Sequence, residues 1–147
     1  MRRLASSFSS ILAIIALSGC VNINTSVQKV TDVSRFRHYF VQKNTNDDHG
    51  IAAMIAIALQ AHGLDAVYGP LTMCPDTAEV IVTYEDRWTW DFKNHMISLR
   101  VIASTAQENK TLAIGTYYGA TAVAADSDDI VKELVQKILT TAPNITP

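Results

Sequence analysis

Two segments of the chain repeat their residues at the spacing of an amphipathic helix. The first repeats at i, i+3, i+4, i+7, i+8 and i+11, through Ile51, Met54, Ile55, Ala58, Leu59 and His62. Asp47 or Asp48 can cap it, and Gly63 stands where a helix stop is expected. The second has an apolar stripe made of Ile130, Val131, Leu134, Val135, Ile138 and Leu139. Asp126 or Ser127 is its candidate cap and Pro143 its stop, so the pattern predicts two helices.

Five further segments show the period of two that is typical of strands: residues 35–41, 64–68, 79–90, 95–104 and 112–118. The later segments are joined by short polar turns, which favours antiparallel pairing. The element order predicts an α+β fold. We expect a two-layer sandwich in which a mainly antiparallel sheet of about four to five strands carries both helices on one face. A single domain is expected over residues 34–143, followed by a tail over residues 144–147.

The N-terminus combines a positive start, a short apolar run and small residues. Arg2 and Arg3 precede residues 11–17, and the run ends at Leu17-Ser18-Gly19-Cys20. This arrangement is typical of a secretory signal peptide. Because the expected cut falls directly before a cysteine, Leu-Ser-Gly-Cys also resembles the lipobox of bacterial lipoproteins. The resemblance implies cleavage after Gly19, diacylglycerol on the Cys20 sulfur and acylation of the new N-terminus.

Two other interpretations of this N-terminus are a transmembrane helix and a soluble secretory signal. A spanning helix needs about 20 apolar residues, roughly twice the length of this run. A soluble signal more often ends in an Ala-x-Ala site, which would make Cys20 a coincidence. We therefore predict a lipoprotein signal peptide over residues 1–19, and a lipidated Cys20 with a tether over residues 20–33. The alternative for the end of the tether is a first strand at its apolar Val27, Val30 and Val33. By resemblance to enteric sorting, Val21 in place of Asp indicates the outer membrane, where we expect the domain to face the periplasm.

Composition limits the partners of this chain and its disulfide chemistry. The formal net charge is −2, and loss of Arg2 and Arg3 makes the mature chain more acidic. Nucleic acid is not favoured as a partner, because phosphates are bound mainly by Lys and Arg. If lipid occupies Cys20, Cys74 has no internal disulfide partner. Cys74 could be a reactive or bridging thiol, or it could simply fill space as a small apolar residue. We favour the apolar role, because no His or Lys nearby in the sequence would lower the pKa of its thiol.

One short run contains both tryptophans and four ionisable residues: Tyr84-Glu85-Asp86-Arg87-Trp88-Thr89-Trp90-Asp91. On a strand, alternation places Tyr84, Asp86, Trp88 and Trp90 on one face. They could form an aromatic platform with a carboxylate that binds a sugar, a peptide or a partner loop. The alternative is cross-strand aromatic packing with the charges on the solvated face. We favour it, because the spacing alone does not distinguish a core tryptophan from an exposed one. The candidate binding residues are Tyr84, Asp86, Trp88, Trp90 and Asp91.

The same run carries a family resemblance. Tyr84-x-Asp86-x-Trp88-x-Trp90-Asp91 is similar to a motif of small, uncharacterised outer-membrane lipoproteins of Gram-negative bacteria. The match extends to the segments 36–39, 112–115 and 131–135 and to the apolar helix ending near Gly63. It implies an envelope protein without assigned catalytic activity, and it transfers no active site.

Patterns for metal binding and catalysis are missing from the sequence. The four histidines, His38, His49, His62 and His95, have no ligand spacing, and neither a Gly-x-Ser-x-Gly elbow nor a phosphate-binding loop is present. We therefore expect no catalytic residue, metal or cofactor. The predicted function is non-enzymatic: a lipid-anchored envelope protein that binds or assembles with another envelope protein. The alternative is a glycan- or peptide-binding module, or a minor envelope hydrolase, that uses the face of Tyr84, Asp86, Trp88 and Trp90.

Overall fold

The computed structural model describes residues 23–91, 93–119 and 125–144, with Asp91 described by its backbone only. The predicted signal peptide, Cys20 and residues 145–147 of the predicted tail lie outside the described residues. The elements, in chain order, are β1 (Thr25–Lys29), η1 (Val33–Arg35), β2 (His38–Gln42), α1 (Ile51–Ala61), β3 (Asp65–Gly69), η2 (Leu71–Met73), β4 (Val80–Asp91), β5 (Lys93–Thr105), β6 (Thr111–Tyr118) and α2 (Ser127–Thr140). Among the helices so described, none has the length and apolar character needed to cross a membrane.

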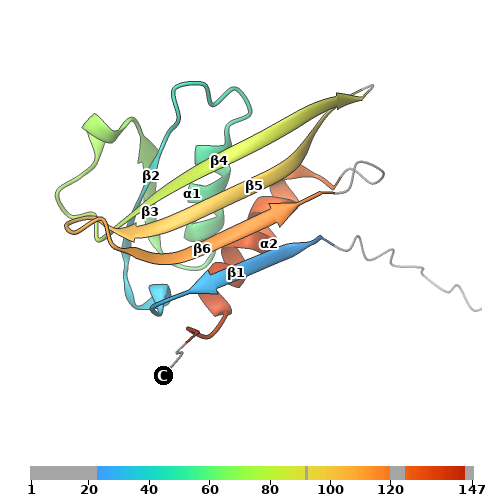
Figure 1. Ribbon diagram of the computed structural model, residues 1–147. Coiled ribbons are helices and arrows are strands. Elements are labelled where there is room, and N and C mark those ends of the chain that lie inside the picture. The colour runs from blue at the N-terminus through green and yellow to red at the C-terminus, as the bar shows by residue number, and fades with distance from the viewer. Residues whose placement is uncertain (1–22, 92, 120–124, 145–147) are drawn as a thin grey trace, which may run out of the picture.

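The strands form one mixed sheet in the order β1-β6-β5-β4-β2-β3 (Figure 1). β4 pairs antiparallel with β5 and β5 with β6, as the short turns between them require. β1 also pairs antiparallel with β6, although these two strands lie far apart in the chain. β2 is parallel to β3, because α1 carries the chain back along the sheet between them. β2 is also parallel to β4, which follows β3 through η2. The α+β class with two helices is confirmed. The expected sheet of about four to five mainly antiparallel strands is corrected to a 6-stranded mixed sheet.

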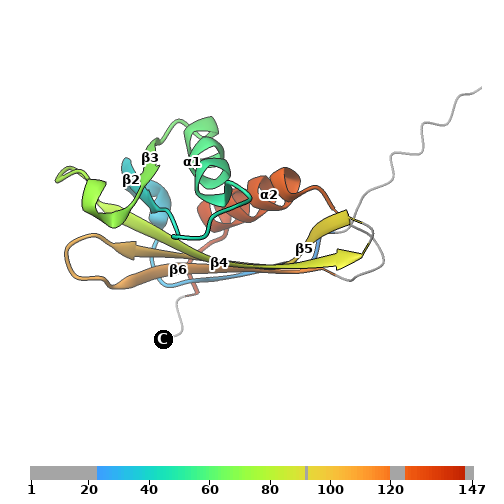
Figure 2. The same ribbon diagram turned by 90° about the horizontal axis from the view of Figure 1, so that it is seen from above.

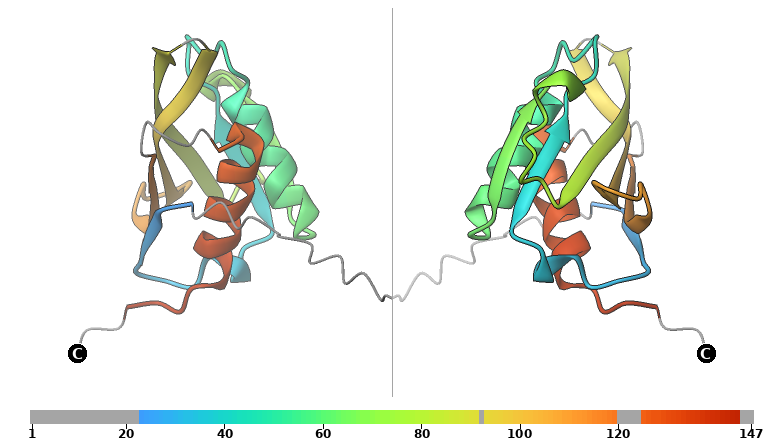
Figure 3. Two further views of the ribbon diagram at one scale, coloured as in Figure 1. Left: turned by 90° about the vertical axis from the view of Figure 1, so that its right-hand side faces the viewer. Right: turned by 90° about the vertical axis from the view of Figure 1, so that its left-hand side faces the viewer.

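Both helices cover the same face of the sheet, and within the described residues the opposite face carries no helix (Figure 2). They lie side by side across that face and contact one another (Figure 3). The periodicity identified the buried side of α2 correctly, since all the residues of its predicted stripe are buried. α1 buries Ile51, Ile55 and Leu59 together with three alanines, whose small side chains allow close packing.

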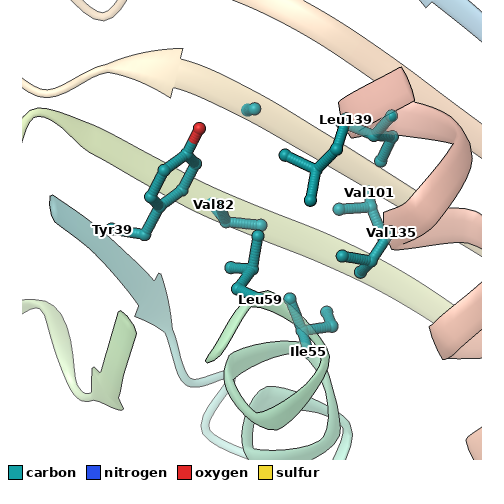
Figure 4. Close-up of a pocket in the computed structure, with 9 residues that line it drawn as sticks. Tyr39, Ile55, Leu59, Val82, Val101, Val135 and Leu139 are labelled. Carbon is teal, nitrogen blue, oxygen red and sulfur yellow. The ribbon is translucent and has the colours of Figure 1, made fainter. Parts of the chain in front are cut away.

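The space between the helices and the sheet is filled. A cavity of about 10 Å³ remains there, lined by the ring of Tyr39 and by aliphatic side chains such as Ile55, Val82 and Leu139 (Figure 4). A water molecule needs about this much room and also polar partners, which such a lining does not supply. This region is therefore a packed core and offers no ligand site.

β1 lies within the segment that was expected to be a tether. It pairs with β6 as an edge strand, and its Lys29 side chain is 2 % exposed. The Lys29 ammonium donates to the carbonyl of Leu139 at the end of α2 (3.1 Å) and pairs with Asp32 (3.1 Å). These contacts attach the strand to the core. Residues 25–29 are thus part of the sheet, and only four residues separate Cys20 from β1.

Both helix starts use an aspartate, as the sequence suggested. The Asp47 carboxylate accepts hydrogen bonds from the backbone N–H of Ile51 (2.8 Å) and Ala52 (3.1 Å), although the residue before α1 is Gly50 in the left-handed conformation. In α2, Asp126 is the cap and accepts from the N–H of Asp128. Anionic oxygens at these positions satisfy orphan donors and favour the positive end of each helix.

Candidate functional site

The predicted site residues lie along β4, and alternation places four of them, Tyr84, Asp86, Trp88 and Trp90, on the face of the sheet that carries the helices. Their cross-strand partners on β5 are Val101 opposite Tyr84, Leu99 opposite Asp86 and Met96 opposite Trp88. All three partners are buried. The side chains on this face of β4 therefore point toward the core wherever the helices cover the sheet.

Tyr84 belongs to the core. Its side chain is 3 % exposed, and its hydroxyl accepts a hydrogen bond from the N–H of Asn44 at 3.2 Å. The Asn44 side-chain amide also donates to the backbone carbonyl of Tyr84 at 3.0 Å. Burial raises the pKa of Tyr84 to about 12, with the nearby Asp47 and Asp86 carboxylates adding to the shift. Tyr84 therefore packs and holds the loop before α1, and its ring is not available to a ligand.

Trp88 is half-buried and already has partners. Its indole stacks on the His49 ring with centroids 3.7 Å apart and 10° between the planes. Its N–H donates to the Asp86 carboxylate at 2.6 Å. The residue also packs against the hydrophobic core. The stack and the hydrogen bond fix the ring at the end of the sheet near the start of α1, so one ring face is occupied by His49.

Trp90 is the exception, because its side chain is 73 % exposed. It lies opposite Asn94 close to the end of the β4–β5 hairpin. Asp91 ends β4, but its side chain lies outside the described part of the structure. Of the candidate aromatic residues, Trp90 therefore has the accessible ring. An isolated exposed indole can stack or enter an interface, but by itself it supplies no chemistry.

The histidines are spread over the fold, as their sequence spacing suggested. His38 pairs with Asp65 at 2.9 Å on the surface, while His49 stacks on Trp88. His95 is buried, with Nδ1 3.3 Å from the carbonyl of Lys93. Within residues 23–91, 93–119 and 125–144, no three His, Cys, Asp or Glu side chains gather as a metal site.

Cys74 lies in the loop after η2 and is partly exposed. Burial raises the pKa of its thiol, and repulsion from the Asp76 carboxylate adds to the shift. Both effects disfavour the thiolate, which is the nucleophilic form of cysteine.

An apolar surface that sequence reasoning missed lies at the outer edge of the sheet. We call Val67, Tyr68, Leu71 and Met73 the β3 edge patch; all four side chains are exposed, and they lie on both faces of the edge, because Val67 and Tyr68 follow one another on β3. Beside it, on the helix-free face, a groove of about 520 Å³ is lined in part by Leu71, Gln42, Ile81 and Ile102. The available signal was the apolar character of both alternating positions in the segment 64–68, but only the strand order reveals that this strand is an edge.

The stacked His49 was also missed. In sequence His49 is 39 positions from Trp88, and no local pattern connects them. The contact exists because the loop before α1 crosses the end of β4, which is set by the parallel pairing of β2 with β4.

Comparison with known proteins gives a fold and no family. No family model and no curated protein matches the chain. The fold is similar to that of a dodecamer of a singly substituted PelC from Paraburkholderia phytofirmans, with a TM-score of 0.57 and 13% identity over 80% of this chain and 96% of that one. A second PelC dodecamer structure from this organism has a TM-score of 0.56 and 13% sequence identity, over 80% of this chain and 95% of that one. A PDZ domain protein from Parabacteroides distasonis gives 0.54 and 8% identity, over 80% of this chain and 36% of that one.

Proposed function

We propose that the mature chain is a lipid-anchored cell-envelope protein on the periplasmic side of the outer membrane, and that it acts without catalysis by binding protein partners. The anchor rests on the run Leu17-Ser18-Gly19-Cys20 after a short apolar segment and two arginines. Val21 after the cysteine supports the outer membrane as the destination. No cofactor is part of this proposal.

The observation that carries the binding role is the β3 edge patch. Its four exposed apolar side chains lie at an edge strand, and the strand presents backbone groups that can pair with another chain. Gln60 protects part of this edge, because its side-chain amide donates to the Ala66 carbonyl at 2.7 Å. An unpaired edge strand flanked by exposed apolar side chains favours pairing with another protein chain.

The first partner to test is a second copy of the chain. PelC, which has a similar fold, is described as a dodecamer. A heterologous contact that uses one edge of the sheet can be repeated from copy to copy and closes into a ring when the rotation allows it. For this chain, assembly through the β3 edge patch would bury side chains that a lone domain exposes to water.

A site-specific crosslinking experiment tests the binding role. A photoreactive phenylalanine analogue is placed at Val67 or Met73 in the edge patch, and at the exposed Asp129 in α2, which packs against β6 and β1, as the matched control. We expect irradiation in intact cells to give adducts at twice the chain mass from Val67 and Met73 but not from Asp129. Equal yields at all three positions, or no adduct from the patch, would contradict the proposal.

The anchor is tested separately. A Cys20→Ala variant should lose both membrane association and incorporation of a radiolabelled fatty acid, because one thiol carries the thioether lipid. An unchanged membrane fraction in this variant would refute lipidation at Cys20.

A further inference from the structure

The start of β1 is aligned across the sheet with one residue on each of the strands β6, β5 and β4. The carbonyl of Asn24, just before β1, accepts a hydrogen bond from the N–H of Tyr118 at 3.1 Å. Tyr118 pairs with Ser98 on β5, and Ser98 pairs with Arg87 on β4. Asn24 therefore marks one end of a line that crosses the sheet to Arg87.

Beyond this line, β4 and β5 continue as a two-stranded hairpin. β4 extends through Asp91, past the end of β6 and the start of β1 (Figure 1). At about 3.3 Å per residue, its last residues after Arg87 reach about 13 Å past the line. The hairpin projects from the same end of the sheet at which the chain enters β1 (Figures 1 and 2).

The length of chain between Cys20 and Asn24 matches this projection. Four residues at about 3.3–3.6 Å each span at most about 14 Å. A lipid on Cys20 therefore holds the start of β1 within about 14 Å of the bilayer surface. The hairpin reaches about as far from the same line, so a sheet held by this tether brings the hairpin tip to the membrane.

The side chains at this end suit a membrane surface. Trp90 is 73 % exposed and Tyr118 is 64 % exposed, and Lys93 at the tip is also exposed. Trp and Tyr are enriched at membrane–water interfaces because each ring is apolar with one polar group. A lysine adds attraction to anionic headgroups. The turn at the opposite end, residues 107–110, carries only polar and charged side chains, so the two ends of the sheet differ in chemistry.

We propose that the β4–β5 hairpin tip is a second membrane contact, with the Trp90 ring at headgroup level in the leaflet that holds the Cys20 lipid. This inference rests on the proposed anchor. Two contacts at one end of the sheet orient the domain with its strands rising from the bilayer. The β3 edge patch then faces sideways along the membrane, where neighbouring anchored molecules can reach it.

The protein contains its own control for this contact, because Trp88 and Trp90 are its two tryptophans. Single-tryptophan variants of the full mature chain are made as Trp88→Phe, which keeps Trp90, and Trp90→Phe, which keeps Trp88. Each lipidated variant is reconstituted into phosphatidylethanolamine–phosphatidylglycerol vesicles, with or without bromine on the acyl chains near the headgroup. Circular dichroism checks the fold, and flotation with mass spectrometry checks the anchor.

Comparing brominated with unbrominated vesicles cancels any quenching by the stacked His49. We expect a clear loss of Trp90 emission in brominated relative to unbrominated vesicles, and a much smaller loss for Trp88. Flotation with no loss at Trp90, or with equal loss at both positions, would overturn the hairpin contact and leave the anchor intact. Failure to float, with no lipid mass on Cys20, would overturn the anchor and this inference with it.

Discussion

Gly115 offers the sharpest test of how the two layers are packed. It lies on β6 between Val27 of β1 and Val101 of β5. A Cβ added at this position would meet Cδ1 of Ile138 at 2.7 Å, Cγ1 of Ile138 at 2.9 Å and Cδ1 of Leu134 at 3.0 Å. The glycine therefore lets α2 approach the sheet closely, and Gly115→Ala forces the helix or its side chains to move.

The expected size of the effect follows from two opposing terms. Overpacking a filled core costs about 1–3 kcal/mol, since side chains must leave their preferred rotamers. Replacing glycine also restricts the unfolded chain, which offsets about 0.4–1 kcal/mol. We expect Gly115→Ala to lower the free energy of unfolding by about 1–2 kcal/mol. At about 2.1 cal/mol/K per residue, this corresponds to a fall in Tm of about 4–8 °C.

The assay is urea unfolding followed by circular dichroism on the Cys20→Ala chain. The matched control is Gly69→Ala, because a Cβ there would lie 3.7 Å from the Met73 Cβ, an ordinary contact. The control should change stability by less than about 0.5 kcal/mol. Ile138→Ala vacates the space that the new methyl group needs. The double variant Gly115→Ala/Ile138→Ala should therefore lose about 1 kcal/mol less free energy of unfolding than the sum of the losses in the two single variants. A neutral Gly115→Ala, or strict additivity with Ile138→Ala, would refute this account of the layer contact.

Three further predictions concern a cap, a buried tyrosine and the thiol. Asp47→Ala should destabilise the fold by about 1–2 kcal/mol in urea, because two N–H groups of α1 lose their acceptor, whereas Asp48→Ala should have little effect; equal losses would contradict the assignment. The pKa of Tyr84 is raised from 10.0 to about 12, so its contribution to stability is present below pH 10 and lost as the pH rises toward 12. Denaturation midpoints measured across this range should fall less steeply for Tyr84→Phe, and an unchanged slope would count against a buried neutral Tyr84. In the Cys20→Ala chain at neutral pH, Cys74 should react with Ellman's reagent more slowly in the folded protein than in the urea-unfolded protein, because the fold raises the pKa of its thiol. A faster reaction in the folded protein would indicate an activated thiol.

Much of the fold followed from periodicity. The apolar stripe of α2 and the stop of α1 at Gly63 appear in the structure where the sequence placed them, and Gly63 has the positive φ of 76° expected at a helix end. These features depend on neighbours within a few positions, so a local pattern is enough to predict them. The long alternation of β4 was equally clear, because one of its faces is largely buried.

β1 was assigned to the tether because its own residues carry little strand signal. Thr25, Ser26 and Gln28 are polar, and the buried residue at its end is Lys29 rather than an apolar side chain. The strand is stable through its pairing with β6 and the contact of Lys29 with the end of α2, both with partners far along the chain. Edge strands are decided by tertiary pairing to a greater extent than by intrinsic preference.

The candidate site shows the same division. From sequence, Tyr84, Asp86, Trp88 and Trp90 were equivalent members of one strand face. The structure separates them by position along β4: Tyr84 is in the core, Trp88 is stacked on His49, and Trp90 lies on the hairpin that β4 and β5 form beyond β6 and β1. Alternation determines which face a side chain occupies, but it does not determine how far the covering layer extends.

The sequence alone determined the two helices, the alternating strands and the lipobox-like run before Cys20, because each is written in neighbouring residues. Tertiary structure alone decided that β3 is an exposed edge, that β2 runs parallel to β4, and that the start of β1 lies at the same end of the sheet as Trp90. These properties arise from the order in which distant strands pair. They depend on burial summed over the whole core, which no local pattern contains.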